Sequence, residues 1–150
     1  MKSIVLYSSF TGRTKAVAEA VASGLPQGTP CVSVEHIPDD IDSYDCVFFG
    51  CWVHDGVADE GSQQVLGKLH NKHIAVFATM AEDPFSDEAS KSLHNAIEIL
   101  PPGSRVDGTY ITIVQSKEHF MDMITETPHD MDLSGARLFA ENTFSRILAA

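Results

Sequence analysis

Residues 3–24 read SIVLYSSFTGRTKAVAEAVASG, and this stretch decides the fold class. It starts with a short run of apolar, largely β-branched side chains, which is typical of a strand that is covered on both faces. The chain from Thr14 to Gly24 is rich in alanine, carries Val17 and Val21 on one helical face and ends on a glycine, so it predicts a helix. A short polar loop joins the two elements. The stretch is therefore a strand, a loop and a helix, the repeating unit of a parallel sheet.

The same alternation continues to the end of the chain. Five apolar runs predict parallel strands, at residues 3–7, 32–36, 45–50, 73–79 and 110–115. Helical spacing of apolar side chains predicts further helices at residues 62–70, 86–100 and 134–148. The Met-rich segment 118–132 predicts a short helix that Pro128 terminates. We therefore expect an α/β fold, a three-layer, doubly wound, five-stranded parallel sheet, in a single domain over residues 1–150.

Charge and composition exclude several classes of protein. The 150 residues hold 10 Lys+Arg and 21 Asp+Glu, a formal net charge of −11, so a nucleic acid is repelled at long range. No apolar stretch reaches the ~18 residues of a membrane span, and the first apolar run is too short for a secretory signal. The three cysteines have no CxxC spacing, and we interpret His70 and His73 as a surface turn because no third metal ligand lies nearby. We expect a cytoplasmic protein with reduced thiols, no bound metal, and no nucleic-acid or membrane partner.

The polar loop after the first strand is the first candidate binding site. In an open parallel sheet, ligands bind beyond the carboxyl ends of the strands, where the strand order reverses. This loop, Ser8 to Thr14, ends at a helix N-terminus, where backbone N–H groups and the helix dipole attract an anion. A phosphate is the expected occupant, and simple capping of the helix by the hydroxyl groups is the alternative. The loop has neither GxxxxGK[ST] nor GxGxxG, so an ATP-binding P-loop and a dinucleotide fingerprint are excluded.

The spacing Ser9-x-Thr11-Gly12-x-Thr14 resembles the phosphate loop of the flavodoxin family, T/S-x-T-G-x-T, which holds the phosphate of FMN. The element pattern of nearly the whole chain is similar to that family's sheet, whose strand order is 2-1-3-4-5. The resemblance implies an FMN site in which the phosphate is held by Ser9, Phe10, Thr11, Gly12, Arg13 and Thr14. Arg13 stands where many members of the family have asparagine.

The loop after the third strand is a candidate for contact with the flavin ring. It runs from Gly50 to Glu60 and carries the only tryptophan of the chain, and a flat apolar tricycle needs a large side chain against its face. The resemblance implies flavin contacts from Cys51, Trp52 and Val53, and a tryptophan packed in the core is the alternative. We interpret Cys51 as a packing residue rather than a nucleophile, because no base is evident beside it.

The loop after the fourth strand is similar in position to the third flavin-contacting loop of the family. The resemblance implies that the ring is framed by the backbone of Thr79, Met80 and Ala81. This loop lacks the tyrosine that commonly covers the second flavin face in the family. We expect Met80 or Phe85 to replace it, or that face to be open to a partner.

Together these features predict an FMN-binding, flavodoxin-like electron carrier that needs no catalytic acid, base or nucleophile. A carboxylate ~10 Å from the flavin lowers its reduction potential by on the order of 20 to 70 mV, so the acidic composition predicts a low-potential donor. The same charge predicts a redox partner with a basic docking surface, and we expect a monomer or weak dimer. Two alternatives stay open: an FMN-dependent reductase of a small molecule such as a quinone, and a flavin-free regulatory or interaction protein on the same fold.

Overall fold

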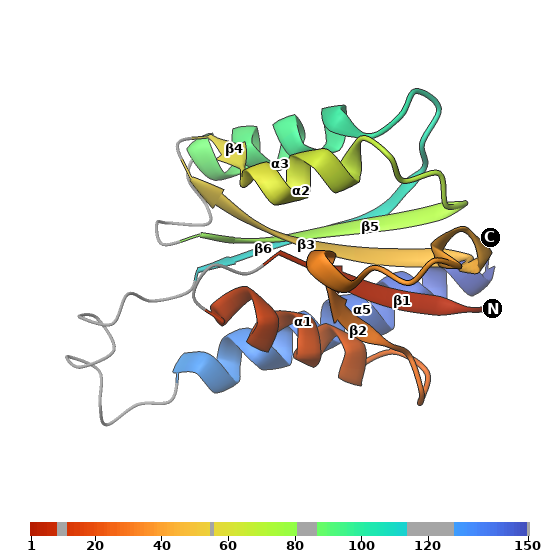
Figure 1. The fold of residues 1–150 in the computed structure, drawn as a ribbon. Coiled ribbons are helices and arrows are strands. Elements are labelled where there is room, and N and C mark those ends of the chain that lie inside the picture. Colours follow the sequence, from red (N-terminus) through yellow and green to blue (C-terminus); the bar gives the residue numbers. More distant parts are fainter. Residues whose placement is uncertain (9–11, 55, 81–86, 114–127, 150) are drawn as a thin grey trace.

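The structure is a computed structural model, and it describes residues 1–8, 12–54, 56–80, 87–113 and 128–149. Strands and helices alternate along the chain (Figure 1). The strands are β1 (Ser3–Tyr7), β2 (Cys31–Ser33), β3 (Cys46–His54), β4 (Val57–Ala58), β5 (His73–Met80) and β6 (Val106–Ile113). The helices are α1 (Arg13–Ser23), α2 (Glu60–Leu66), α3 (Asp87–Ile99) and α5 (Pro128–Ala149), with short 3₁₀ helices at Val34–His36 and Ile41–Ser43.

Five of these strands form one parallel sheet in the order β2-β1-β3-β5-β6. Counted along the chain as five parallel strands, this is the order 2-1-3-4-5, so the predicted doubly wound α/β fold is confirmed. The short β4 lies off this path and pairs antiparallel with the end of β3, with Val53 opposite Ala58. The strand order reverses between β1 and β3. A ligand-binding crevice is therefore expected at the carboxyl ends of these two strands.

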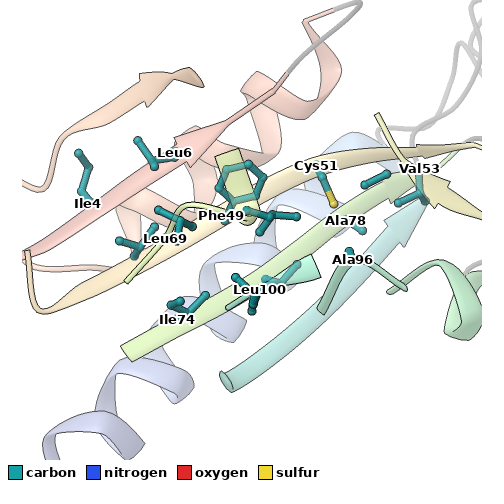
Figure 2. Packing of buried hydrophobic residues seen from close by; sticks show 14 of the residues in the cluster. Ile4, Leu6, Phe49, Cys51, Val53, Leu69, Ile74, Ala78, Ala96 and Leu100 are labelled. Atoms are coloured by element: carbon teal, nitrogen blue, oxygen red, sulfur yellow. The ribbon is translucent and has the colours of Figure 1, made fainter. Parts of the chain in front are cut away.

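Helices cover both faces of the sheet and make three layers. α1 and α5 lie on one face, and α2 and α3 lie on the other (Figure 1). Because successive strand residues point to opposite faces, the strands contribute to two separate hydrophobic clusters. Figure 2 shows the cluster beneath α2 and α3, which contains Leu6 and Phe49. The cluster beneath α1 and α5 contains Val5, Phe48 and Phe77, all fully buried.

Gly50 allows the two central strands to pack closely. It lies opposite Phe77 in the register of β3 and β5. A Cβ atom at position 50 would collide with the Phe77 ring, so β5 can place this ring in the core only because residue 50 has no side chain. The path of β3 toward Trp52 depends on that close approach.

Several element boundaries differ from those predicted. β3 continues four residues past Gly50, because its end pairs with both β5 and β4. β2 ends at Ser33, whose hydroxyl accepts a hydrogen bond from the backbone N–H two residues later (3.2 Å) and so starts a 3₁₀ helix. Pro128 begins α5 instead of ending a helix, because the first turn of a helix does not use the N–H that proline lacks. The rest of the predicted short helix, 118–127, lies outside the described residues.

The amino end of β6 also differs from the prediction. β6 begins at Val106 rather than Tyr110, and Asp107 lies at a register shift in its pairing with β5. The two carboxylate oxygens of Asp107 lie 2.9 Å from His73 Nδ1 and 2.9 Å from Arg105 Nε. His73, which we expected in a surface turn, is therefore buried, because Asp107 gives its ring a polar partner at the edge of the core.

The described residues contain neither a membrane-spanning helix nor a cluster of metal ligands. No helix in these ranges is both long enough and apolar enough to span a bilayer. Nor do any three His, Cys, Asp or Glu side chains there gather closely enough to hold a metal ion.

Candidate functional site

The three candidate loops start side by side at one edge of the sheet. They follow β1, β3 and β5, which are adjacent and parallel, so the carboxyl ends of these strands meet. The Ser8 backbone N–H donates to the Gly50 carbonyl (2.9 Å), which holds the start of the first loop against β3. Trp52 pairs in register with Thr79. The structure therefore brings together the points at which all three loops start.

The first loop leads into α1, which starts at a glycine. Gly12 is the N-cap residue, with φ of 85° in the left-handed region, and no side-chain capping bond is made there. A Cβ atom added at Gly12 would find no other atom within 4 Å. The first turn of α1 begins with Arg13 and contains no acidic residue. The positive end of the helix dipole, worth ~0.5 of an elementary charge, is thus not neutralised by a carboxylate of its own first turn.

A pair of buried threonines ties α1 to β5. The hydroxyl oxygens of Thr14 and Thr79 lie 2.8 Å apart, and the two residues are 2% and 0% exposed. Residues paired across parallel strands share a face, so the half-buried Trp52 lies with Thr79 on the side of the sheet that α1 covers. One threonine hydroxyl donates to the other, and the accepting hydroxyl keeps its own hydrogen for a further acceptor. The start of α1 and the tryptophan are therefore neighbours.

Asp59, which is not among the predicted site residues, joins the first two loops. Its carboxylate accepts hydrogen bonds from Ser62 N (3.1 Å), Ser62 Oγ (2.7 Å), Trp52 N (3.0 Å) and Ser8 Oγ. Its own N–H donates to the Trp52 carbonyl (2.8 Å). An aspartate just before a helical stretch is a capping signal, so the bonds to Ser62 were open to prediction. The bond to Ser8 spans 51 positions of the chain and has no local signal.

Three predicted contact residues have their side chains in the core. Cys51, Val53 and Met80 are at most 3% exposed, in the cluster beneath α2 and α3, on the face opposite Trp52; Figure 2 labels Cys51 and Val53. Any contact of these three residues with a ligand at this edge of the sheet would therefore have to come from the backbone. The expectation that the Met80 side chain covers the second flavin face is corrected, because that side chain is buried. Burial, with the charge of Asp59 added, raises the pKa of the Cys51 thiol to about 12, so the thiol stays protonated at neutral pH.

Part of the predicted site lies outside the described residues. This part consists of the predicted contact residues Ser9, Phe10, Thr11 and Ala81, together with Phe85. Their roles stay predictions from the sequence. Gly12, Arg13, Thr14, Trp52 and Thr79 are the predicted site residues that the structure places together, with Cys51, Val53 and Met80 beneath them.

The sequence from residue 4 to residue 143 matches the family model of the flavodoxin domain. This chain belongs to the flavodoxin family. The chain is similar in sequence to a curated protein, the flavodoxin-like domain-containing protein BilS of Clostridioides difficile (strain CD3). The two are 36% identical over 114 residues. The match covers 74% of this flavodoxin-family chain and 65% of BilS, so the chain spans less than two thirds of that relative's length.

Solved flavodoxin structures share the fold of this family member. Oxidised Flavodoxin 1 from Bacillus cereus superposes with a TM-score of 0.69 at 16% identity, covering 97% of this chain and 98% of that one. The flavodoxin of Streptococcus pneumoniae TIGR4 gives 0.68 at 18% identity, with 97% and 99% covered. A flavoprotein from Lactobacillus acidophilus NCFM, solved in complex with FMN, gives 0.59 at 16% identity, with 83% and 99% covered. At these identities the likeness shows the fold alone.

Proposed function

We propose that this flavodoxin-family chain binds FMN and carries electrons to a redox partner that has a basic docking surface. The observation that carries the proposal is the position of the α1 N-terminus, which starts at Gly12 and has no acidic residue in its first turn, beside the half-buried Trp52, with the Thr14 and Thr79 pair between them. A flat ring system that bears a phosphate needs an anion site and a large apolar side chain next to each other. Family membership, and the FMN complex of the structurally similar L. acidophilus flavoprotein, support this choice of ligand.

The phosphate would be held at the start of α1. The N–H groups of a first helical turn have no partners within the helix, and the dipole favours a negative charge there. Arg13 adds a positive side chain at this position, and Thr14 can donate to a phosphate oxygen when Thr79 donates to Thr14. Gly12 places no Cβ atom between the backbone and the ligand. Backbone dipoles and hydroxyl groups therefore allow a chain of net charge −11 to bind a phosphate.

The ring would lie against Trp52 at the carboxyl end of β3. FMN supplies the electron chemistry when bound, and the residues of the chain orient it and set the charge around it. The backbone of Thr79 and Met80, at the end of β5, would lie along the edge of the ring. The buried Cys51 and Val53, on either side of Trp52, anchor this strand end in the core. Transfer of an electron requires no acid, base or nucleophile from the chain.

Negative charge near the ring would set both the reduction potential and the choice of partner. Asp59 and Glu60 lie where β3 and β4 lead into α2, within an overall charge of −11. A carboxylate ~10 Å from the ring opposes an added electron by about 0.4 to 1.7 kcal/mol, so we expect a low-potential donor. The same field attracts a basic surface, and we expect the association rate with such a partner to fall as salt is raised.

Titration of the purified chain with FMN, followed by flavin fluorescence, tests the ligand. We expect saturable binding at micromolar flavin or below, and a reduction potential below that of free FMN. Lack of binding at micromolar FMN contradicts the carrier and the reductase together, and leaves a flavin-free protein on this fold.

A second measurement separates a carrier from a reductase. The FMN-loaded chain should not oxidise NADH or NADPH by itself, because a carrier takes its electrons from a separate reductase. Steady oxidation of either nucleotide by the purified chain with a quinone as acceptor would favour the reductase instead.

A further inference from the structure

The Asp59 carboxylate bonds to three separate parts of the fold. Oδ1 accepts from Trp52 N (3.0 Å) and Ser62 Oγ (2.7 Å), and Oδ2 accepts from Ser62 N (3.1 Å) and Ser8 Oγ. An N-cap residue stabilises its helix by accepting from the first helical N–H groups, which the bond from Ser62 N provides. The bonds from Ser8 and Trp52 come from the ends of β1 and β3 and contribute nothing to capping. Asp59 therefore does more than start α2.

The charge of Asp59 is not neutralised by a nearby cation. Its four donors are hydroxyl and backbone N–H groups, and none of the ion pairs in the described part of the chain includes Asp59. The carboxylate is half-buried at the end of β3. Its field reaches the neighbouring core, since it adds to burial in raising the pKa of Cys51 to about 12. A negative charge thus lies beside the peptide of Trp52.

Ser8 is the point at which the first loop is fastened. It directly precedes the predicted phosphate loop, Ser9 to Thr14. Its backbone N–H donates to Gly50 O (2.9 Å), and its hydroxyl donates to Asp59. Gly61 lies next to this contact, because a Cβ atom added there would be at ordinary van der Waals distance, 3.5 Å, from both Ser8 Oγ and Asp59 Oδ2. Ser8 is therefore held against β3 by its backbone and against Asp59 by its side chain.

We propose that Asp59 is a positioning residue of the flavin site. By clamping Ser8 onto the Trp52 peptide, it holds the end of β1, which leads to the phosphate loop, against the end of β3, which leads to the ring loop, before the ligand arrives, and it leaves a negative charge beside the ring. Holding both loops in advance removes an ordering cost from binding, so the clamp strengthens the affinity for a ligand that contacts both. This inference rests on the proposed binding of FMN.

Three variants test the clamp. Ser8→Ala removes the hydrogen bond from the Ser8 hydroxyl to Asp59. It leaves the cap of α2 and the backbone bond from Ser8 to Gly50 intact. Asp59→Asn removes the charge and part of the hydrogen bonding. Asp42→Asn is the matched control, because Asp42 is exposed near the amino end of β3, at the opposite edge of the sheet, and undergoes the same charge change. The measurements are the Kd for FMN, the Kd for riboflavin, the midpoint potential of bound FMN and the Tm of the free chain.

We expect Ser8→Ala and Asp59→Asn to weaken FMN binding at least tenfold, and to weaken FMN more than riboflavin, because only FMN uses the phosphate loop. Asp59→Asn should also shift the potential to more positive values, whereas Ser8→Ala keeps the charge and should leave the potential close to that of the wild type. Asp42→Asn should bind both flavins within twofold of the wild type. Ser8→Ala should lower the Tm by no more than about 4 °C, because Asp59 keeps its other three donors.

The inference is overturned if Ser8→Ala binds FMN as the wild type does, and this variant decides the matter if Asp59→Asn does not fold. It is also overturned if Asp59→Asn loses FMN and riboflavin equally while its Tm falls, because that result assigns Asp59 to the cap of α2 alone. A wild-type chain that binds no FMN removes the proposed function and this inference together. If the wild type binds FMN, and Ser8→Ala and Asp59→Asn bind it with the same Kd as the control, only this inference is removed.

Discussion

α1 and α2 both begin at the carboxyl edge of the sheet, yet their N-termini are completed in opposite ways. α1 starts at Gly12, which has no side chain to cap the helix, and its first turn contains no acidic residue. α2 starts at Asp59, whose carboxylate caps it, and Glu60 follows in its first turn. The first turn of α1 holds no carboxylate of its own, whereas the N-terminus of α2 already holds an anion of the chain. Of the two, the α1 terminus is the one whose dipole can favour an external anion.

A side chain added at Gly12, at the start of α1, should have the largest effect on FMN binding. Valine at Gly12 has to adopt a φ of 85°, at a cost of about 1–2 kcal/mol, and its side chain would occupy the space that the phosphate needs. We expect Gly12→Val to raise the Kd for FMN about a hundredfold, or ~2.7 kcal/mol, in a fluorescence titration. Gly28→Val is the control, because Gly28 has a φ of 90° and no neighbour within 4 Å, but lies in the turn before β2. Equal affinity in Gly12→Val and the wild type would refute the assignment of the phosphate loop.

Cys51, a buried thiol on the face of the sheet that α2 covers, makes the free energy of unfolding fall at alkaline pH. The pKa of Cys51 rises from its ordinary 9.0 to about 12 in the folded chain, through burial first and the charge of Asp59 second. Between these values the unfolded chain has lost the thiol proton and the folded chain still holds it. The free energy of unfolding therefore falls with rising pH, by about 1.4 kcal/mol per pH unit from this group. Urea unfolding of Cys51→Ala should show a slope shallower by that amount between about pH 9 and pH 11. Equal slopes in the two proteins would contradict the burial of this thiol.

The threonine pair is the contact that holds the α1 side against the sheet. Thr79→Val leaves the buried Thr14 hydroxyl without its partner, so we expect the free energy of unfolding to fall by about 1–3 kcal/mol. Changing both threonines to valine should cost less than the sum of the single changes, because both polar groups are then removed together. Urea unfolding of the two single variants and the double variant measures this coupling. Strict additivity would show that the two hydroxyls do not bond.

Giving α1 an acidic first turn like that of α2 should have the smallest effect. Lys15 is exposed in the first turn of α1, and Lys15→Glu should stabilise the free helix by about 0.3–1 kcal/mol. The same change should weaken FMN binding by about two- to fivefold, because it places a carboxylate near the phosphate. Lys68→Glu is the control, since Lys68 is exposed beyond the far end of α2. The difference between the two variants should shrink as salt is raised, and a difference that persists at 1 M salt would contradict an electrostatic cause.

The fold was predictable because its signals are local and repeated. The apolar run at residues 3–7 matches β1, and the alternation of strands with helices indicates a parallel sheet. Two of the boundaries that were wrong depend on pairing with another element. β3 extends past Gly50 because β4, which follows it almost directly, folds back on it, and β6 starts early because Asp107 pairs with His73. His73 and Asp107 lie 34 positions apart, so no local pattern shows their contact, and the two residues of β4 are too few to give a strand signal of their own.

The site was predictable only in part, for the same reason. Gly12 and Thr14 belong to a motif of six residues, and Trp52 is the only tryptophan at the end of a predicted strand. The apolar character of Val53 and Met80 does not say which face of the strand they occupy. The register places both in the core, on the face opposite Trp52, because alternate residues of a strand point to opposite sides.

By itself, the sequence determined the class of fold, the strand that ends at each candidate loop and the polar, glycine-containing loop before the first helix, because each of these depends on neighbouring residues. Only the tertiary structure decided that Thr14 meets Thr79 and that Asp59 joins Ser8 to Trp52, across 65 and 51 positions of the chain. A hydrogen bond acts over about 3 Å, and only the packing of β1, β3 and β5 side by side brings such distant groups that close.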